Sequence, residues 1–136
     1  MDRNNLKFKA ISLNVRGIRA FEKRKSIFNW LIKQNADICF LQETYSTNDV
    51  VDQWKKQWPG ECFFSHGSNH SRGVAILNRK SLDFKMKSMC ADVDGRYLIV
   101  EANIQSRYPL SPGKHTRPKH KSETILVFSI IVRVYF

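Results

Sequence analysis

Two short runs rich in apolar residues, each with a polar residue at or next to its end, frame an amphipathic segment near the start of the chain. The first run is LKFKAISLNV, residues 6–15, and the second is ADICFLQE, residues 36–43. Between them, residues 20–34 repeat apolar side chains at helical spacing. A crossover helix of this kind joins parallel neighbouring strands. The sequence therefore predicts a β-α-β unit whose two strands lie side by side and parallel.

The segment between the two runs is one-sided, which is typical of a helix packed on one face of a sheet. Asn35 follows it and is suited to end the helix in a left-handed conformation. The expected apolar side consists of Phe21, Ile27, Phe28, Leu31 and Ile32. The expected solvent side consists of Lys23, Arg24, Lys25 and Lys33.

The two predicted strands end in residues that can bind a cation. Asn14 closes the first strand and Glu43 closes the second. Since the carboxyl ends of parallel strands meet at one sheet edge, where ligands gather, we expect both side chains at that edge. Their oxygens are donors that a hard cation such as Mg²⁺ prefers. An acid at a strand end can instead cap a turn or pair with a lysine, and spacing alone leaves both interpretations open.

The middle of the chain predicts a second helix and several short strands. Residues 47–49 offer N-caps for a helix that buries Trp54 and Trp58 and ends at residues 59–60. Two short strands flank the polar loop HGSNHSRG, residues 66–73. Strands over 82–93 and 96–104 form a hairpin around Asp94-Gly95, a strong two-residue turn signal. The expected buried face of the last strand consists of Leu98, Val100, Ala102 and Ile104.

The C-terminal part changes in composition. Residues 105–123 contain three of the four prolines and five basic residues, which predicts a flexible basic loop or linker. Residues 124–136 form an apolar run that includes Arg133 and is shorter than the roughly 20 residues of a membrane helix. We therefore expect a buried strand of uncertain register there, and no membrane partner.

The formal net charge of +11 is the strongest compositional signal. Excess Lys and Arg favours polyanions, either nucleic acid or anionic lipid headgroups, although basic residues also serve simply to solvate a surface. The N-terminal stretch MDRNNLKFK lacks the apolar region of a signal peptide, which predicts an intracellular protein with the nucleus as a candidate compartment. Cys39, Cys62 and Cys90 lack zinc-site spacing and are expected to be reduced core thiols.

Four sequence words carry a family resemblance. They are ISLNVRG at 11–17, ADICFLQET at 36–44, RGVAIL at 72–77 and GRYLIVEANI at 95–104. In this order and spacing they resemble the endonuclease/exonuclease/phosphatase superfamily of metal-dependent phosphodiesterases. Within it, the chain is most similar to the apurinic-type endonuclease domains that accompany reverse transcriptases in non-LTR retrotransposons.

The resemblance implies an α/β (α+β) fold, a partial four-layer α/β sandwich whose C-terminal half is missing. It divides the chain into three parts. Residues 1–104 are the N-terminal part of the superfamily domain, residues 105–123 a basic proline-containing loop, and residues 124–136 an apolar strand.

The resemblance also implies site residues. Glu43 matches the metal-binding glutamate of the family, and Asn14 matches the asparagine beside it, with Mg²⁺ or Mn²⁺ as cofactor. Tyr135 is a weaker match to a catalytic tyrosine, because Arg133 stands where the family has asparagine. The later GDFN-like and SDH-like words of the family do not occur in the sequence. We therefore expect a truncated DNA endonuclease domain that is inactive alone.

Two other functions stay open from the sequence: a non-catalytic nucleic-acid-binding fragment, and part of a phosphatase acting on a phosphoinositide or another small phosphoester. The expected partners are DNA and, in a longer parent chain, a reverse transcriptase. The four histidines are expected to be solvent-exposed. Candidate phosphate contacts are Arg16, Arg72, Lys114, Arg117, Lys119 and Lys121.

Overall fold

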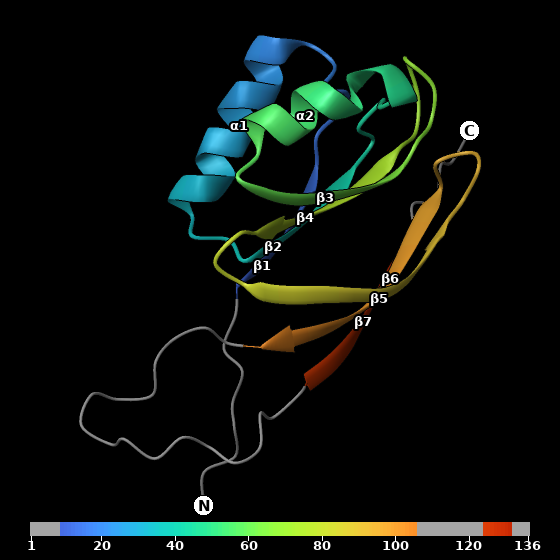
Figure 1. The fold of residues 1–136 in the computed structure, drawn as a ribbon. Coiled ribbons are helices and arrows are strands. Elements are labelled where there is room, and N and C mark those ends of the chain that lie inside the picture. Colours follow the sequence, from blue (N-terminus) through green and yellow to red (C-terminus); the bar gives the residue numbers. More distant parts are fainter. Residues whose placement is uncertain (1–8, 106–123, 132–136) are drawn as a thin grey trace, which may run out of the picture.

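The structure is a computed structural model that describes residues 9–105 and the backbone of residues 124–131. Figure 1 shows three layers: two helices, a four-stranded sheet below them, and a three-stranded sheet on the far side of the first sheet. Helices and strands mix as predicted, so the α+β class is confirmed. In the described ranges no helix covers the outer side of the second sheet, and the sandwich is partial in this sense.

The four-stranded sheet contains the predicted β-α-β unit. Strands β1 (Ala10–Asn14) and β2 (Ile38–Gln42) pair in parallel, and helix α1 (Phe21–Lys33) connects them. Strands β3 (Gly60–Ser65) and β4 (Val74–Arg79) complete the order β1-β2-β4-β3 through antiparallel pairs. The parallel pair therefore lies at one side of the sheet.

A short 3-10 turn and helix cover the same sheet beside α1. The turn η1 (Asn48–Val50) leads into α2 (Val51–Gln57). Trp54 and Trp58 are buried as predicted, and the ring of Phe28 packs edge-on against both, with ring centroids 5.5 Å and 5.4 Å apart. These aromatic contacts hold the two helices against each other.

The three-stranded sheet is antiparallel, in the order β5 (Asp83–Ala91), β6 (Tyr97–Gln105) and β7 (Thr124–Ile131). The register of β7, uncertain from the sequence, pairs Ile104 with Thr124 and Tyr97 with Ile131. The domain boundaries expected at residues 104 and 123 stay a prediction. The predicted inner face of β6 is confirmed, since Leu98, Val100, Ala102 and Ile104 are all fully buried.

The β5–β6 hairpin turns through a longer loop than the sequence predicted. The last backbone bond between the two strands runs from the N–H of Asp92 to the carbonyl of Tyr97, so the prediction of a two-residue turn at Asp94-Gly95 is wrong. The reason is the Asp92 carboxylate, which accepts bonds from the main-chain N–H and the guanidinium of Arg96, both at 2.9 Å. These bonds lower the pKa of Asp92 and organise the wider turn.

The predicted faces of α1 are partly wrong. Arg24, expected in solvent, is fully buried, whereas Phe21 and Ile32 are 51% and 41% exposed. Arg24 turns inward because it finds acceptors there: the carbonyls of Ile18 and Arg19 at 3.2 Å and 2.9 Å, and two glutamine side chains of α2. The hydrogen bonds that the buried guanidinium makes therefore explain why this side of the helix faces inward.

Only one of the three cysteines is a fully buried core thiol. Cys39 is buried, Cys62 is half-buried and packs against the core, and Cys90 is exposed on β5, which corrects the prediction for Cys90. All three are free, and burial raises the pKa of Cys39 and of Cys62 to about 12. These two groups are therefore neutral thiols at physiological pH.

Candidate active site

Asn14 and Glu43 leave the sheet at the same edge. In the parallel register Asn14 lies opposite Gln42, and Glu43 follows directly. The ladder continues beyond the strands, since the N–H of Val15 donates to the Gln42 carbonyl at 2.9 Å and that of Gly17 to the Glu43 carbonyl at 2.6 Å. Asn14 is exposed and Glu43 half-buried. The structure thus brings together the two residues on which the sequence prediction depends.

The side chain of Asn14 shapes the turn that follows it. Its Oδ1 accepts a bond from the N–H of Arg16 at 3.1 Å, and Arg16 and Gly17 have φ of 48° and 81°. A β-carbon on Gly17 would lie 2.2 Å from the ring of Tyr45. The turn after β1 therefore packs tightly against the segment after β2, and only glycine fits there.

The segment after β2 is strained. Glu43 and Tyr45 have φ of 53° and 58°, a region that costs a non-glycine residue about 1–2 kcal/mol. Backbone bonds hold the segment, because the N–H of Thr44 donates to the Gly73 carbonyl at 3.1 Å and that of Tyr45 to the Arg72 carbonyl at 2.8 Å.

Arg72 has the same left-handed backbone, with φ of 64°. Among the described residues, four of the five non-glycine residues with positive φ lie at this edge: Arg16, Glu43, Tyr45 and Arg72. Strain of this kind concentrates at functional sites, where the surrounding structure enforces it.

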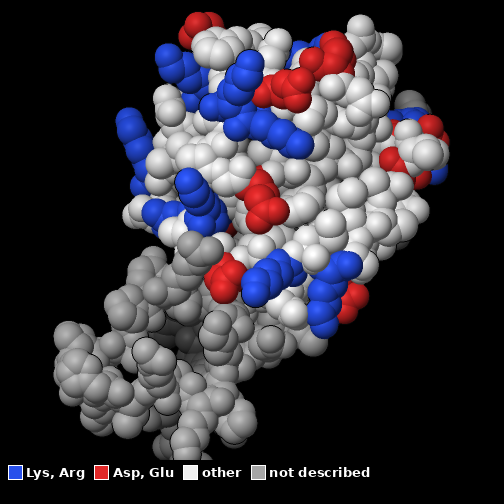
Figure 2. Space-filling model, viewed as in Figure 1, with Lys and Arg blue, Asp and Glu red and all other residues white. Residues whose placement is uncertain are grey.

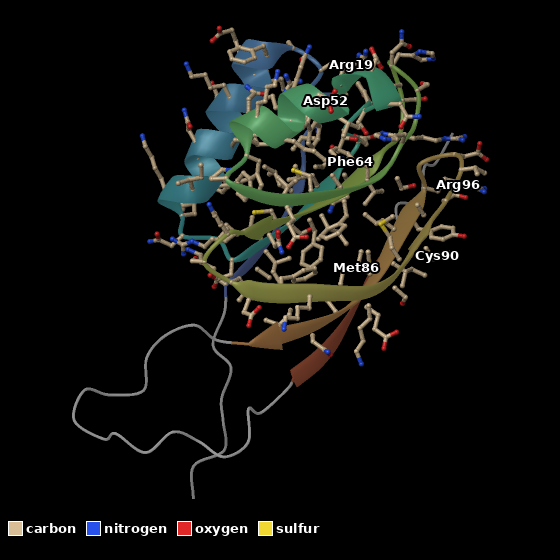
Figure 3. All side chains as sticks on the ribbon, viewed as in Figure 1. Arg19, Asp52, Phe64, Met86, Cys90 and Arg96 are labelled. Carbon is tan, nitrogen blue, oxygen red and sulfur yellow. The ribbon has the colours of Figure 1, made fainter. Side chains whose placement is uncertain are left out.

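Arg19 is a contributor that the sequence reasoning missed. Its guanidinium donates to the Tyr45 carbonyl at 3.1 Å, to Thr47 Oγ1 at 2.6 Å and to Asp49 at 3.2 Å. Figure 3 places Arg19 at the top of the helical layer, near the start of α2. It anchors the far end of the segment that carries Glu43. No spacing in the sequence points to it, because its partners lie 26 to 30 residues away.

The histidine prediction is half correct. His70 is exposed, as expected, but His66 is half-buried. The ring of His66 stacks on that of Phe64, with centroids 5.1 Å apart, and its Nδ1 lies 2.9 Å from Ser46 Oγ. Burial lowers the pKa of His66, against opposing contributions from Ser46 and Asp49. The other two histidines, His115 and His120, lie outside the described residues.

The remaining predicted site residues divide into two groups. Arg16 is exposed and Arg72 half-buried, and both belong to the loops around Asn14 and Glu43. On the face drawn in Figure 2, lysines and arginines are spread widely and interleaved with acids, so charge alone does not outline an interface there. The predicted residues that lie outside the described part are Lys114, Arg117, Lys119, Lys121 and Tyr135.

The donor set at this edge suits a hard cation but is small. A carboxylate and an amide oxygen match the preference of Mg²⁺ for oxygen, and Mg²⁺ commonly keeps waters and uses one or two protein carboxylates. Within the ranges that the structure describes, no group of three or more His, Cys, Asp or Glu side chains is placed to hold a metal. Glu43 and Asn14 thus carry oxygens of the type that Mg²⁺ binds, and the backbone register places the two residues at one edge.

A family model described as the Endonuclease/Exonuclease/phosphatase family matches residues 11–121. The chain belongs to this family. It is also 30% identical over 96 residues to an uncharacterized 149 kDa protein of transposon TX1 from Xenopus laevis, a match that covers 71% of this chain and 7% of that protein. The predicted family is confirmed, and the transposon relative supports the predicted likeness to proteins of mobile elements.

Two solved structures of TDP2 have the same fold as this chain. That of C. elegans is 18% identical with a TM-score of 0.53, and covers 77% of this chain and 33% of that one. A humanized D. rerio form with 14 mutations is 19% identical with a TM-score of 0.54, and covers 91% of this chain and 47% of that one. The chain thus spans less than half of either structure.

Within the described ranges, no helix is both long enough and apolar enough to cross a membrane.

Proposed function

We propose that the chain is part of a metal-dependent DNA endonuclease domain, in which Glu43 binds Mg²⁺ or Mn²⁺ and Asn14 holds the same cation or the adjacent phosphate. The observation that carries the proposal is the parallel register of β1 and β2, which delivers both residues to one edge. The family match supports a nuclease or phosphodiesterase function in general terms.

Hydrolysis of a phosphodiester requires neutralised phosphate charge, an activated water and a stabilised leaving oxygen. A bound divalent cation supplies the first and the third. Glu43 holds its carboxylate on a segment whose backbone is fixed from both sides, and Asn14 has its Oδ1 oriented by the N–H of Arg16. Neither Glu43 nor Asn14 activates the water in this proposal, so that role requires further groups.

The chain alone is expected not to nick DNA. The sequence contains neither a GDFN-like nor an SDH-like word, and no group of three metal ligands forms among the residues described. The test is incubation of supercoiled plasmid with the chain and Mg²⁺ or Mn²⁺, with the Glu43→Ala variant alongside. Nicking that disappears in the variant would contradict the expected inactivity and would make Glu43 part of a complete active site.

Binding of duplex DNA is expected to be sensitive to salt. If two or three phosphates are contacted, affinity falls about tenfold or more between about 50 and 200 mM salt, because counterions are released on binding. Arg16→Gln should weaken binding and reduce the salt slope, whereas Lys85→Gln on the exposed surface of β5 should not. Fluorescence anisotropy of a labelled duplex measures both. A salt-independent affinity, or equal effects of the two variants, would contradict the proposed interface.

We further propose that the chain acts within a longer protein that also carries a reverse transcriptase, in the nucleus. The support is the transposon relative, a 149 kDa protein of which the match covers 7%. The second candidate, a nucleic-acid-binding module without catalysis, is favoured by the net charge of +11. This second candidate predicts that the affinity for DNA changes neither on addition of Mn²⁺ nor in the Glu43→Gln variant.

A further inference from the structure

A chain of buried hydrogen bonds links His66 to the segment that carries Glu43. Thr44 and Ser46 are both fully buried. The N–H of Ser46 donates to Thr44 Oγ1 at 3.2 Å, the two hydroxyl oxygens lie 3.1 Å apart, and Ser46 Oγ lies 2.9 Å from His66 Nδ1. This series of hydrogen bonds joins the segment after β2 to the loop that precedes β4.

The donor and acceptor roles in this series of hydrogen bonds follow from counting protons. Thr44 Oγ1 already accepts the Ser46 N–H, and its own hydroxyl donates to Ser46 Oγ. The Ser46 hydroxyl then has one acceptor within the described residues, the Nδ1 of His66. Were Nδ1 protonated, it would donate to Ser46 Oγ, and the proton of either the Ser46 or the Thr44 hydroxyl would then lack an acceptor among these groups. An unmade bond of this kind is costly in the interior. The network therefore favours neutral His66 with its proton on Nε2.

His66 is itself held on two sides. Its ring stacks on Phe64 at an interplanar angle of 19°. A β-carbon on Gly95 would lie 2.7 Å from the His66 carbonyl, so the β5–β6 turn packs directly on this loop. The same turn reaches the loop end, where the N–H of Gly73 donates to the Gly95 carbonyl at 3.0 Å. The turn of the second sheet thus supports the backbone of the loop that carries His66.

We propose that His66 is a positioning residue for Glu43: as the Nε2–H tautomer it accepts the Ser46 hydroxyl and, through Ser46 and Thr44, holds the left-handed backbone on which Glu43 depends. This inference rests on the proposed role of Glu43 as a metal ligand. Segments with two left-handed residues relax when their anchors are removed. Outer partners of this kind typically affect metal affinity by roughly 10–100-fold. The lowered pKa of His66 is consistent with a neutral ring.

The test compares variants of the whole chain that separate the hydrogen bond from the packing. His66→Phe keeps a ring on Phe64 but removes Nδ1, whereas His66→Asn loses the ring but keeps an acceptor near the Nδ1 position. His70→Phe is the matched control, because His70 is an exposed histidine of the same loop. Imidazole ¹⁵N shifts report the tautomer, the Glu43 amide shift reports the segment, and Mn²⁺ affinity and Tm are measured for every variant.

We expect the Nε2–H tautomer in the wild type. We expect His66→Phe to shift the Glu43 amide and weaken Mn²⁺ binding about tenfold, His66→Asn to restore part of the affinity despite a lower Tm, and His70→Phe to change nothing. An Nδ1–H tautomer, or an unshifted Glu43 amide in His66→Phe, would overturn the inference. Wild-type protein that binds no Mn²⁺ would instead overturn the proposed function, while the tautomer and the amide shift would still decide the role of His66.

Discussion

Replacing Arg24 with alanine is expected to lower the free energy of unfolding by about 3 kcal/mol or more. The side chain is fully buried and donates to the carbonyls of Ile18 and Arg19 and to the side chains of Gln53 and Gln57. Burial and the neighbouring Arg19 lower the pKa of Arg24, and the four hydrogen bonds of its guanidinium offset the cost of burying the charge. Alanine would leave a cavity and several acceptors without donors.

Urea denaturation of three variants measures this effect. Lys25→Ala is the control, since Lys25 is the exposed neighbour of Arg24 on α1, and its change should stay within about 0.5 kcal/mol. Arg24→Met keeps much of the volume but donates no hydrogen bond, and is therefore expected to be nearly as unstable as Arg24→Ala. A methionine variant as stable as the wild type would show that packing, and not the hydrogen bonds, holds the two helices together.

Replacing Glu43 with glutamine is expected to weaken Mn²⁺ binding by more than about tenfold. The substitution keeps the shape and removes the charge, and losing a direct ligand costs at least as much as losing an outer partner, which is worth roughly 10–100-fold. Asp52→Asn removes the same charge from an exposed acid on α2, which Figure 3 shows in the helical layer, and should leave the affinity unchanged. Electron paramagnetic resonance of free Mn²⁺ gives both constants. Equal losses in the two variants would mean that the cation responds only to total charge.

The elements around this site could be predicted because their signals are local. Alternation and helical spacing placed β1, α1 and β2 within a few residues of their observed bounds. The length of the connection then implied a parallel pair, and the parallel pair implied that Asn14 and Glu43 share an edge. Each step uses the chain's own periodicity or the geometry of short connections.

The details of the site could not be predicted, because they depend on contacts between distant segments. The acceptors of Arg24 in α2 lie 29 and 33 residues away, and Ser46 lies 20 residues from His66. The left-handed backbone of Glu43 has no sequence signal either, since glutamate does not favour it. Helical spacing assigned Arg24 to solvent, and the polar loop around His66 predicted an exposed histidine. Both predictions fail because the partners of these residues come from distant segments.

The most direct test of the account is to locate the cation in the ¹⁵N-labelled chain by paramagnetic broadening. With increasing Mn²⁺, the amide signals of Asn14 and Glu43 should broaden first and together, because β1 and β2 deliver them to one edge. Signals from β5, such as that of Lys85, should stay sharp at the same Mn²⁺ concentration. Broadening that begins at the Asp92–Asp94 turn or on α2, while Asn14 and Glu43 remain sharp, would contradict a shared cation at this edge.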